Sequence, residues 1–235
     1  MANFLAIEAA SDSCSIALKT DNTIINRLEA APRMHSRLLY PMLNDVMAEA
    51  GLRPNQLDAV IFGKGPGSFT GLRIAAATAQ GIGFACDIPL IGVSTLQAMA
   101  QQAHQEHKQN NVLAIMDARM NELYIGHYQA DDAGLMQACM DDLICPIQVP
   151  ANELPLQSDT YFACGHGLKL WDQFDASLQA YINEQDAEQV LKAESLLPMA
   201  VSLFNQKQVL APEDIELVYL REQSHWKTIK QQKQQ

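Results

Sequence analysis

The sequence predicts an α/β protein of two similar lobes, each a mixed sheet with helices on its faces. Three apolar stretches separated by short polar turns begin the chain, which is typical of an antiparallel meander. Segments with helical spacing then alternate with single strands. The same succession recurs in the second half of the chain, and such a repeat indicates a duplicated fold.

The first lobe begins with three predicted strands between residues 3 and 30, with the sequences NFLAIEA, SCSIALKT and TIINRLEA. From Ser36 to Gly51 the apolar residues recur at helical spacing, and Gly51 is a natural helix stop. Pro41 predicts a local kink near the start of this helix. A strand DAVIFG, a helix over residues 70–86, a strand PLIGVS and a helix from Thr95 to about His107 follow.

The second lobe repeats this order with the strands VLAIMDA and ELYIGHYQ and a third strand within LMQACMDDLI. A loop or short helix near residues 150–156, a strand YFACG, and helices from Gly167 and over residues 194–206 follow. The predicted order is β-β-β-α-β-α, a bridging β-α, and β-β-β-α-β-α again, which is the architecture of the actin, sugar-kinase and Hsp70 (ASKHA) superfamily. We expect an N-terminal interaction lobe over residues 1–107, including the bridge. We expect a C-terminal lobe over residues 108–235, whose last helix and tail can pack back on the first lobe.

The chain of 235 residues carries a formal net charge of −11, which argues against a large contact with nucleic acid by this chain alone. Its basic clusters are small, at residues 33–37 and in the tail from Arg221. Five cysteines without a CxxC pair and a start without a signal-peptide pattern predict a cytoplasmic protein with reduced thiols. No apolar run has the length of a membrane span.

A glycine-rich turn, GKGPGSFTGLRIA, lies between a predicted strand and a predicted helix. A P-loop is disfavoured because Leu72 stands where that motif has lysine, and because the spacing from Gly65 to Gly71 is one residue too long. A dinucleotide fingerprint is disfavoured because Ser68 replaces its last glycine and the turn follows the fourth strand. We therefore expect a structural turn that enters the helix, with Ser68 or Thr70 as the cap. Its residues are Gly65, Pro66, Gly67 and Ser68.

The helix after this turn carries small residues at every fourth position, which form one smooth ridge: Gly71, Ala75, Ala79 and Gly83. Interior glycines cost a helix roughly 1 kcal/mol each relative to alanine, so the ridge favours close approach by another element. That element can belong to the same chain, where it covers the sheet, or to another chain. The ridge alone favours neither possibility.

An ATP-dependent member of this superfamily needs a glycine-containing turn with a carboxylate between its first two strands. The corresponding turn here, from Glu8 to Cys14, contains Glu8 and Asp12 but no glycine. Its counterpart in the second lobe, from Asp117 to Glu122, also lacks glycine. The sequence therefore does not predict a phosphate site at either turn.

Two pairs of metal-ligating residues are closely spaced, His104 with His107 and Asp141 with Asp142. Both pairs are more typical of a solvated surface than of a metal site. No Ser-His-Asp set can be assembled from the spacing. The sequence therefore predicts no catalytic residue, no cofactor-binding residue and no metal site.

Several motifs together resemble the TsaB (YeaZ) family: GKGPGSFTGLRIA, FLAIEAASDSCSIAL, HSRLLYPMLNDVM, MDARMNELYIGHY and VYLREQSHWK. The resemblance spans most of the chain. It implies a non-catalytic subunit in the bacterial synthesis of threonylcarbamoyladenosine, the modified adenosine next to the anticodon of tRNA. It also implies a TsaD-like catalytic subunit and a TsaE-like ATPase as partners, and homodimers when the chain is alone. Thr95 and Met99 stand where the catalytic paralogue has metal-binding histidines.

We expect tRNA to be the substrate of the whole complex, with little direct contact to this chain. The helices over residues 36–50 and 70–86 are expected to form the face that contacts a partner. One alternative is an ATP-dependent transferase or kinase acting in its own interlobe cleft, and another is a standalone metallopeptidase. The residues expected to bind a partner are Leu39, Met42, Leu43, Met47, Thr70, Gly71, Ala75, Ala79 and Gly83.

Overall fold

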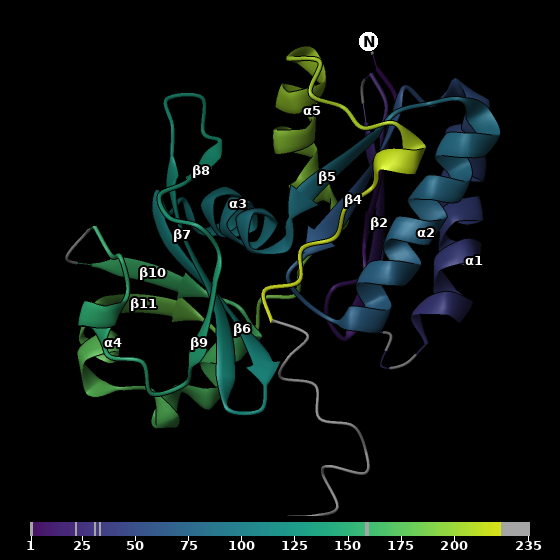
Figure 1. Cartoon of the computed structure of the whole chain (residues 1–235). Helices are drawn as coiled ribbons and strands as arrows, with labels where there is room; N and C mark the ends of the chain where they lie inside the picture. The colour runs from purple at the N-terminus through teal and green to yellow at the C-terminus, as the bar shows by residue number, and fades with distance from the viewer. Residues whose placement is uncertain (1, 22, 31, 33, 158–159, 222–235) are drawn as a thin grey trace, which may run out of the picture.

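The computed structural model of the chain describes residues 2–221 except 22, 31, 33, 158 and 159, and it contains two mixed sheets with helices between and outside them (Figure 1). The predicted α/β class with a duplicated arrangement is confirmed. The predicted basic tail beyond Arg221 lies outside the described residues. Among the helices that the structure describes, none has the length and apolar character of a membrane span.

The first sheet contains the predicted meander. Its strands are β1 (Phe4–Glu8), β2 (Ser13–Lys19), β3 (Ile24–Ala30), β4 (Ala59–Gly65) and β5 (Leu90–Ser94). The first three pair antiparallel, whereas β4 and β5 continue the sheet in parallel, in the order β3-β2-β1-β4-β5. Every residue of β1 is buried because helices cover both faces of this sheet, which explains its continuous apolar run.

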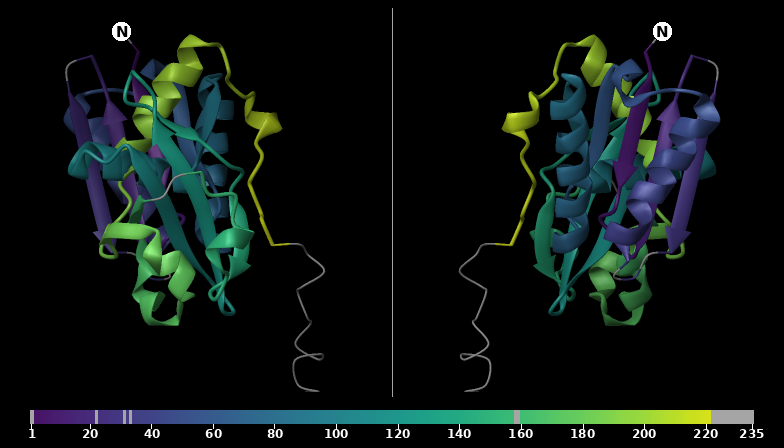
Figure 2. Two further views of the ribbon diagram at one scale, coloured as in Figure 1. Left: turned by 90° about the vertical axis from the view of Figure 1, so that its left-hand side faces the viewer. Right: turned by 90° about the vertical axis from the view of Figure 1, so that its right-hand side faces the viewer.

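Helices α1 (His35–Ala50) and α2 (Phe69–Cys86) cover the outer face of the first sheet (Figures 1 and 2). The apolar residues of α1 recur at helical spacing and pack on the sheet, as predicted. The helix ends at Gly51, which adopts the left-handed conformation with φ 65°. Ser68 caps α2, since its Oγ accepts a hydrogen bond from the amide of Gly71 at 3.3 Å.

In the described part of the chain the second sheet has two more strands than the sequence predicted, because two short strands stand where one was expected and an edge strand was not expected. Its strands are β6 (Asn111–Arg119), β7 (Glu122–Ala130), β8 (Met136–Ala138), β9 (Leu143–Pro146), β10 (Tyr161–Cys164) and β11 (Ile182–Asp186). β11 pairs parallel with β10 at the edge of the sheet. Its sequence, INEQD, is largely polar and lies mostly at the surface, so it lacks the apolar pattern of a buried strand.

Short helices cover the outer face of the second sheet. The segment that the sequence predicted as a helix from Gly167 is a 3₁₀ helix, η3 (His166–Gln173), followed by α4 (Ala176–Ala180), and η2 (Ala151–Glu153) precedes β10. These elements bury a separate apolar cluster with residues such as Leu168 and Leu178. The order of the second sheet is β11-β10-β6-β7-β8, with β9 paired to β7.

A central layer of helices lies between the two sheets. It consists of α3 (Thr95–His107), η4 (Ala193–Leu196) and α5 (Leu197–Asn205). α3 contacts strands of both sheets. α5 packs on β5, and its Phe204 ring meets the Phe4 ring of β1 edge to face. The chain then returns along the first sheet, and Leu210 pairs with Leu90 through two backbone hydrogen bonds. The division of the chain at residue 108 stays a prediction, because α3 belongs to both halves by its contacts.

Candidate functional site

A cleft of about 1040 Å³ lies where the two sheets face each other at their turns. The turn between β1 and β2 and the turn between β6 and β7 form two of its walls. Residues 67–69 and residues 187–191 complete the lining. This is the position at which an ATP-dependent member of the predicted superfamily needs its phosphate-binding turns, so the free donors of both turns decide whether a nucleotide fits.

The backbone amides of the β1–β2 turn are bound by the chain itself. The amide of Ala10 donates to Oε1 of Glu8 at 2.6 Å, and the amide of Ser13 donates to Oγ of Ser11 at 3.3 Å. The imidazole Nε2 of His35 lies 2.8 Å from the carbonyl oxygen of Ser11, and this hydrogen bond attaches the turn to the start of α1. Two donors that a phosphate would need are therefore already used.

The β6–β7 turn is closed in the same way. The amide of Asp117 donates to Nδ1 of His166 at 3.2 Å, and the amide of Arg119 donates to Oδ1 of Asp117 at 2.7 Å. Burial lowers the pKa of the His166 imidazole, which favours the neutral ring that this hydrogen bond requires. Residues 119–121 all have left-handed backbone angles, with φ between 57° and 64°, which turns the hairpin tightly without glycine.

The three lysine and arginine side chains that line the cleft each have a carboxylate partner. Arg119 pairs with Asp117 at 2.9 Å and Lys169 with Glu188 at 2.9 Å. Arg221 donates to the carboxylate of Glu122 and to the carbonyl oxygens of Ala118 and Arg119. With these cations paired and the amides of Ala10, Ser13, Asp117 and Arg119 occupied, the residues present do not fit a nucleoside triphosphate.

Glu8, one of the two acids predicted in the first turn, lies beneath the cleft rather than in it. Its side chain is 1% exposed, and Oε2 has no hydrogen-bond partner among the described residues. Burial raises the pKa of the Glu8 carboxyl to about 7, and burial with the nearby Glu8 raises the pKa of the Cys14 thiol to about 12. A side chain at Gly63 would overlap Oε2 of Glu8, so glycine is needed on the neighbouring strand.

The pairs considered as metal ligands are each engaged separately. Nδ1 of His104 lies 3.0 Å from the carbonyl oxygen of Gln109, and Nε2 of His107 lies 3.0 Å from Oδ2 of Asp186. Asp142 is not a solvated surface acid, because it accepts hydrogen bonds from Tyr128 and from Ser94 and is half-buried. Within the described part of the chain, no group of three or more metal-ligating side chains converges.

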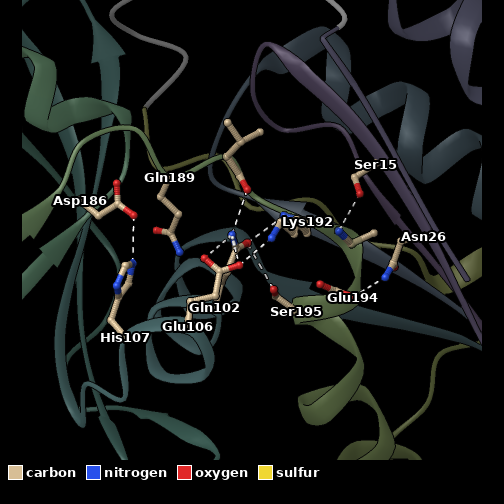
Figure 3. Close-up of polar contacts among 12 residues, drawn as sticks. Ser15, Asn26, Gln102, Glu106, His107, Asp186, Gln189, Lys192, Glu194 and Ser195 are labelled. Atoms are coloured by element: carbon tan, nitrogen blue, oxygen red, sulfur yellow. Dashed lines mark hydrogen bonds and ion pairs between the residues drawn. The ribbon is translucent and has the colours of Figure 1, made fainter. Parts of the chain in front are cut away.

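Residues 186–195, which we term the crossover strap, connect β11 to the central helices (Figure 3), and residues 187–191 of the strap form one wall of the cleft. Gln102 of α3 is buried and holds the strap with both ends of its amide. Its Oε1 accepts from the amide of Lys192 at 2.9 Å and from Oγ of Ser195 at 3.3 Å. Its Nε2 donates to the carbonyl oxygen of Val190 at 3.0 Å. Sequence reasoning missed this residue, because a lone glutamine in a polar helix end has no recognisable pattern.

Further contacts fasten the strap to both sides of the molecule (Figure 3). Oγ of Ser15 on β2 accepts from the amide of Ala193 at 2.9 Å, and Asn26 on β3 donates to Glu194. Lys192 pairs with Glu106 of α3 at 2.7 Å. The strap therefore ties α3 to the first sheet and sets the wall of the cleft.

Most of the residues predicted to bind a partner are buried within this chain. The smooth ridge of α2 faces its own sheet: a side chain at Gly71 would overlap the carbonyl oxygen of Ala9, and one at Gly83 would lie 2.9 Å from Cγ of Pro212. The hypothesis that the ridge packs on another chain is therefore corrected, because the first sheet and the segment after α5 already cover it. Thr70 is exposed, and its contact with a partner stays a prediction. The buried residues are Leu39, Met42, Leu43, Met47, Gly71, Ala75, Ala79 and Gly83.

The exposed side of the same two helices carries a different set of small and aromatic residues. Tyr40 of α1 is 69% exposed and Phe84 of α2 is 60% exposed. Ala77, Gly81 and Ala85 form a second line of small residues at every fourth position of α2, and all three are exposed. We term these five residues the outer face.

The glycine turn supports the start of α2. The bond between Gly65 and Pro66 is cis, and Gly65 has a left-handed φ of 104°. A side chain at Gly67 would lie 2.6 Å from the carbonyl oxygen of Ala10, which shows how closely this turn approaches the β1–β2 turn. Ser68 donates its amide to that same carbonyl oxygen at 2.7 Å and also caps the helix. In this structure the turn thus closes one wall of the cleft with backbone contacts.

Comparisons with known proteins give a consistent result. The family model described as TsaD, tRNA N6-adenosine threonylcarbamoyltransferase, matches residues 22–189. The tRNA threonylcarbamoyladenosine biosynthesis protein TsaB of Escherichia coli is 35% identical over 96% of this chain and 97% of its own length. The TsaB of Haemophilus influenzae is 36% identical over 96% of both chains. The solved structure of YeaZ from Pseudomonas aeruginosa superposes with a TM-score of 0.87 at 33% identity, covering 94% of this chain and all of that one.

Proposed function

Because the chain belongs to the TsaB family, we propose that it is a non-catalytic scaffold and dimerisation subunit in the synthesis of threonylcarbamoyladenosine in tRNA. Its relatives carry that biosynthetic role in their names, and the family model describes the catalytic transferase. We propose a TsaD-like catalytic subunit and a TsaE-like ATPase as partners, a homodimer when the chain is alone, and the cytoplasm as its location. The tRNA is then the substrate of the complex, with little direct contact to this acidic chain.

The observation that carries the scaffold role is the outer face of α1 and α2. The line of small residues on α2 allows a helix of another chain to approach closely, and the contact can also bury the exposed rings of Phe84 on α2 and Tyr40 on α1. The closed turns of the cleft support a role other than nucleotide chemistry, since they leave the amides of Ala10 and Ser13 without a free hydrogen. The proposed contact therefore shifts from the buried ridge to Ala77, Gly81 and Ala85.

Replacing Gly81 by leucine is expected to abolish assembly while the fold is kept. Apart from Gly81 itself, its chain neighbours and the backbone of its own helix, no described atom lies within 4 Å of a Cβ placed at Gly81, and leucine is a better helix former than glycine. The same substitution at buried Ala79 is expected instead to lower the free energy of unfolding by about 1–3 kcal/mol through overpacking. Light scattering of the chain alone and mixed with the TsaD-like subunit measures assembly, and urea unfolding measures stability.

Gln105→Leu is the matched control, because it places leucine on an exposed position of α3, away from the outer face. It should leave both the mass in solution and the binding to the TsaD-like subunit unchanged. If Gly81→Leu assembles like the parent chain with itself and with the TsaD-like subunit, the outer face is not the contact surface and the scaffold proposal fails.

A further inference from the structure

The guanidinium of Arg73 is held by two aromatic rings on the surface of the described chain, near the start of α2. Its Cζ atom lies 3.5 Å from the centroid of the Phe69 ring and 5.7 Å from that of the Tyr219 ring. Its Nε donates to the hydroxyl oxygen of Tyr219 at 3.1 Å, and the two ring centroids lie 5.6 Å apart. These contacts fix the guanidinium in one orientation. We term Phe69, Arg73 and Tyr219 the arginine clamp.

The terminal nitrogens of Arg73 are left available to a ligand. Within the described part of the chain, no hydrogen bond or ion pair involves Nη1 or Nη2 of Arg73, although Arg27, Arg119 and Arg221 each pair with a carboxylate. Arg73 is exposed. The planar guanidinium presents paired N–H groups whose spacing matches the two oxygens of a carboxylate. Arg73 therefore fits an oxyanion that another molecule supplies.

The arginine clamp lies next to the outer face. Arg73 stands one turn before Ala77 on α2, and residues four apart are neighbours on the surface of a helix. Phe69 is 45% exposed and Tyr219 is 46% exposed, so their rings add apolar surface at this end of the outer face. Arginine and aromatic residues are enriched at protein interfaces relative to the rest of a protein surface. The clamp thus continues the proposed contact surface beyond the line of small residues.

The charge of the chain favours a protein carboxylate over a phosphate group of RNA. A nucleic acid is bound by several unpaired cations along its backbone, whereas this chain carries a net charge of −11. Arg221, two residues after Tyr219, is already bound to Glu122. One unpaired guanidinium beside two exposed rings is instead complementary to a single acidic side chain within an apolar contact.

We propose that the arginine clamp binds an acidic side chain of the TsaD-like subunit, with the guanidinium of Arg73 donating to both carboxylate oxygens. Tyr219 is a positioning residue, which acts through its hydrogen bond to Nε of Arg73. The inference rests on the proposed function, because it names the chemistry that the partner brings to this end of the outer face. It also gives the glycine-rich motif a role beyond the entry to α2, since Phe69 and Arg73 both belong to that motif.

Replacing Arg73 by glutamine is expected to weaken binding of the TsaD-like subunit by about tenfold to thirtyfold, which is typical of an arginine that anchors an interface. Isothermal titration calorimetry of the full-length chain with the TsaD-like subunit measures the Kd at low and at high salt, without and with tRNA. The difference between the parent chain and Arg73→Gln should shrink at high salt, because salt screens an ion pair. Tyr219→Phe keeps the ring but removes the hydroxyl, and it should weaken binding roughly threefold.

Lys108→Gln is the matched control, because it removes one positive charge from an exposed position at the end of α3. It should bind the TsaD-like subunit like the parent chain. Urea unfolding shows whether each variant is folded. Gly81→Leu is measured beside these variants, since it tests the outer face itself.

The comparison with Gly81→Leu separates this inference from the proposed function. If Gly81→Leu loses assembly while Arg73→Gln binds like the parent chain, the outer face is retained and the carboxylate contact is rejected. If both variants bind like the parent chain, the inference and the proposed function both fail.

Three further results would overturn the inference. A loss of affinity in Arg73→Gln that is equal at low and high salt would show that Arg73 only holds Tyr219 in place. An equal loss in Lys108→Gln would show that any positive charge on the chain has the same effect. A loss that is seen only when tRNA is present would assign Arg73 to a phosphate group.

Discussion

Replacing Gln102 by leucine is expected to lower the free energy of unfolding by about 2–5 kcal/mol, because it leaves groups of the crossover strap, including buried Ser195 and half-buried Lys192, without a hydrogen bond. The side-chain amide accepts from the amide of Lys192 and donates to the carbonyl oxygen of Val190. Each of these backbone groups would lose its partner on the side of Gln102, where water has little access because Gln102 is 2% exposed. Leucine has a similar size, so a cavity does not contribute.

Urea unfolding followed by circular dichroism measures this loss, and Gln105→Leu, an exposed position on the same helix, supplies the control. The control should stay within about 0.5 kcal/mol of the parent chain. Equal stability of the two variants would show that the strap is held by packing alone and that the hydrogen bonds of Gln102 contribute nothing.

Replacing Glu8 by glutamine is expected to change how stability depends on pH. The pKa of Glu8 rises from 4.5 to about 7 on folding, because burial disfavours the charged carboxylate. Between these values the folded chain binds more protons at this site than the unfolded chain, so the contribution of Glu8 to stability is present below pH 4.5 and is lost as pH rises to 7. The loss amounts to about 3 kcal/mol at 1.36 kcal/mol per pKa unit.

The measurement is the difference in unfolding free energy between Glu8→Gln and the parent chain at several pH values from 4.5 to 8. As pH rises over this range, the free energy of unfolding of Glu8→Gln should increase by about 3 kcal/mol relative to that of the parent chain, whatever the difference is at the lowest pH. The change of this difference with pH is the test, because the glutamine amide also adds hydrogen-bond donors without partners. These donors lower the free energy of unfolding of the variant by the same amount at every pH. Glu29→Gln, an exposed acid on β3, should show a flat difference. A flat difference for Glu8→Gln as well would contradict a raised pKa at Glu8.

The strands and helices of the first sheet could be predicted from the sequence because each one has a clear local pattern. The meander alternates with polar turns, α1 carries apolar residues at helical spacing, and Gly51 ends it in the left-handed conformation. β11 could not be predicted, since an edge strand that is mostly exposed needs no apolar pattern. The family could also be inferred from the sequence, because it rests on short motifs whose residues are contiguous.

The candidate site could be predicted only in part. The absence of glycine from both turns pointed away from a phosphate site, but the occupants of the turn amides, Glu8 and Asp117, became visible only in the structure. Gln102 makes contacts across about 90 residues of sequence, and no local pattern encodes such a pairing. The burial of Glu8 depends on Gly63 on the neighbouring strand, which is again a contact between distant segments.

The small residues of α2 show most clearly what the sequence determines and what only the tertiary structure decides. The sequence by itself determined that α2 is a helix with small residues at every fourth position, because the 3.6-residue period is a local property of the backbone. It contains two such lines, Ala75 with Ala79 and Ala77 with Gly81, and both satisfy the same spacing. Only the tertiary structure decided that Ala75 and Ala79 face the sheet while Ala77 and Gly81 face outward. The rotation of a helix about its own axis is set by what it packs against, and here the first sheet and the segment after α5 pack against one side alone.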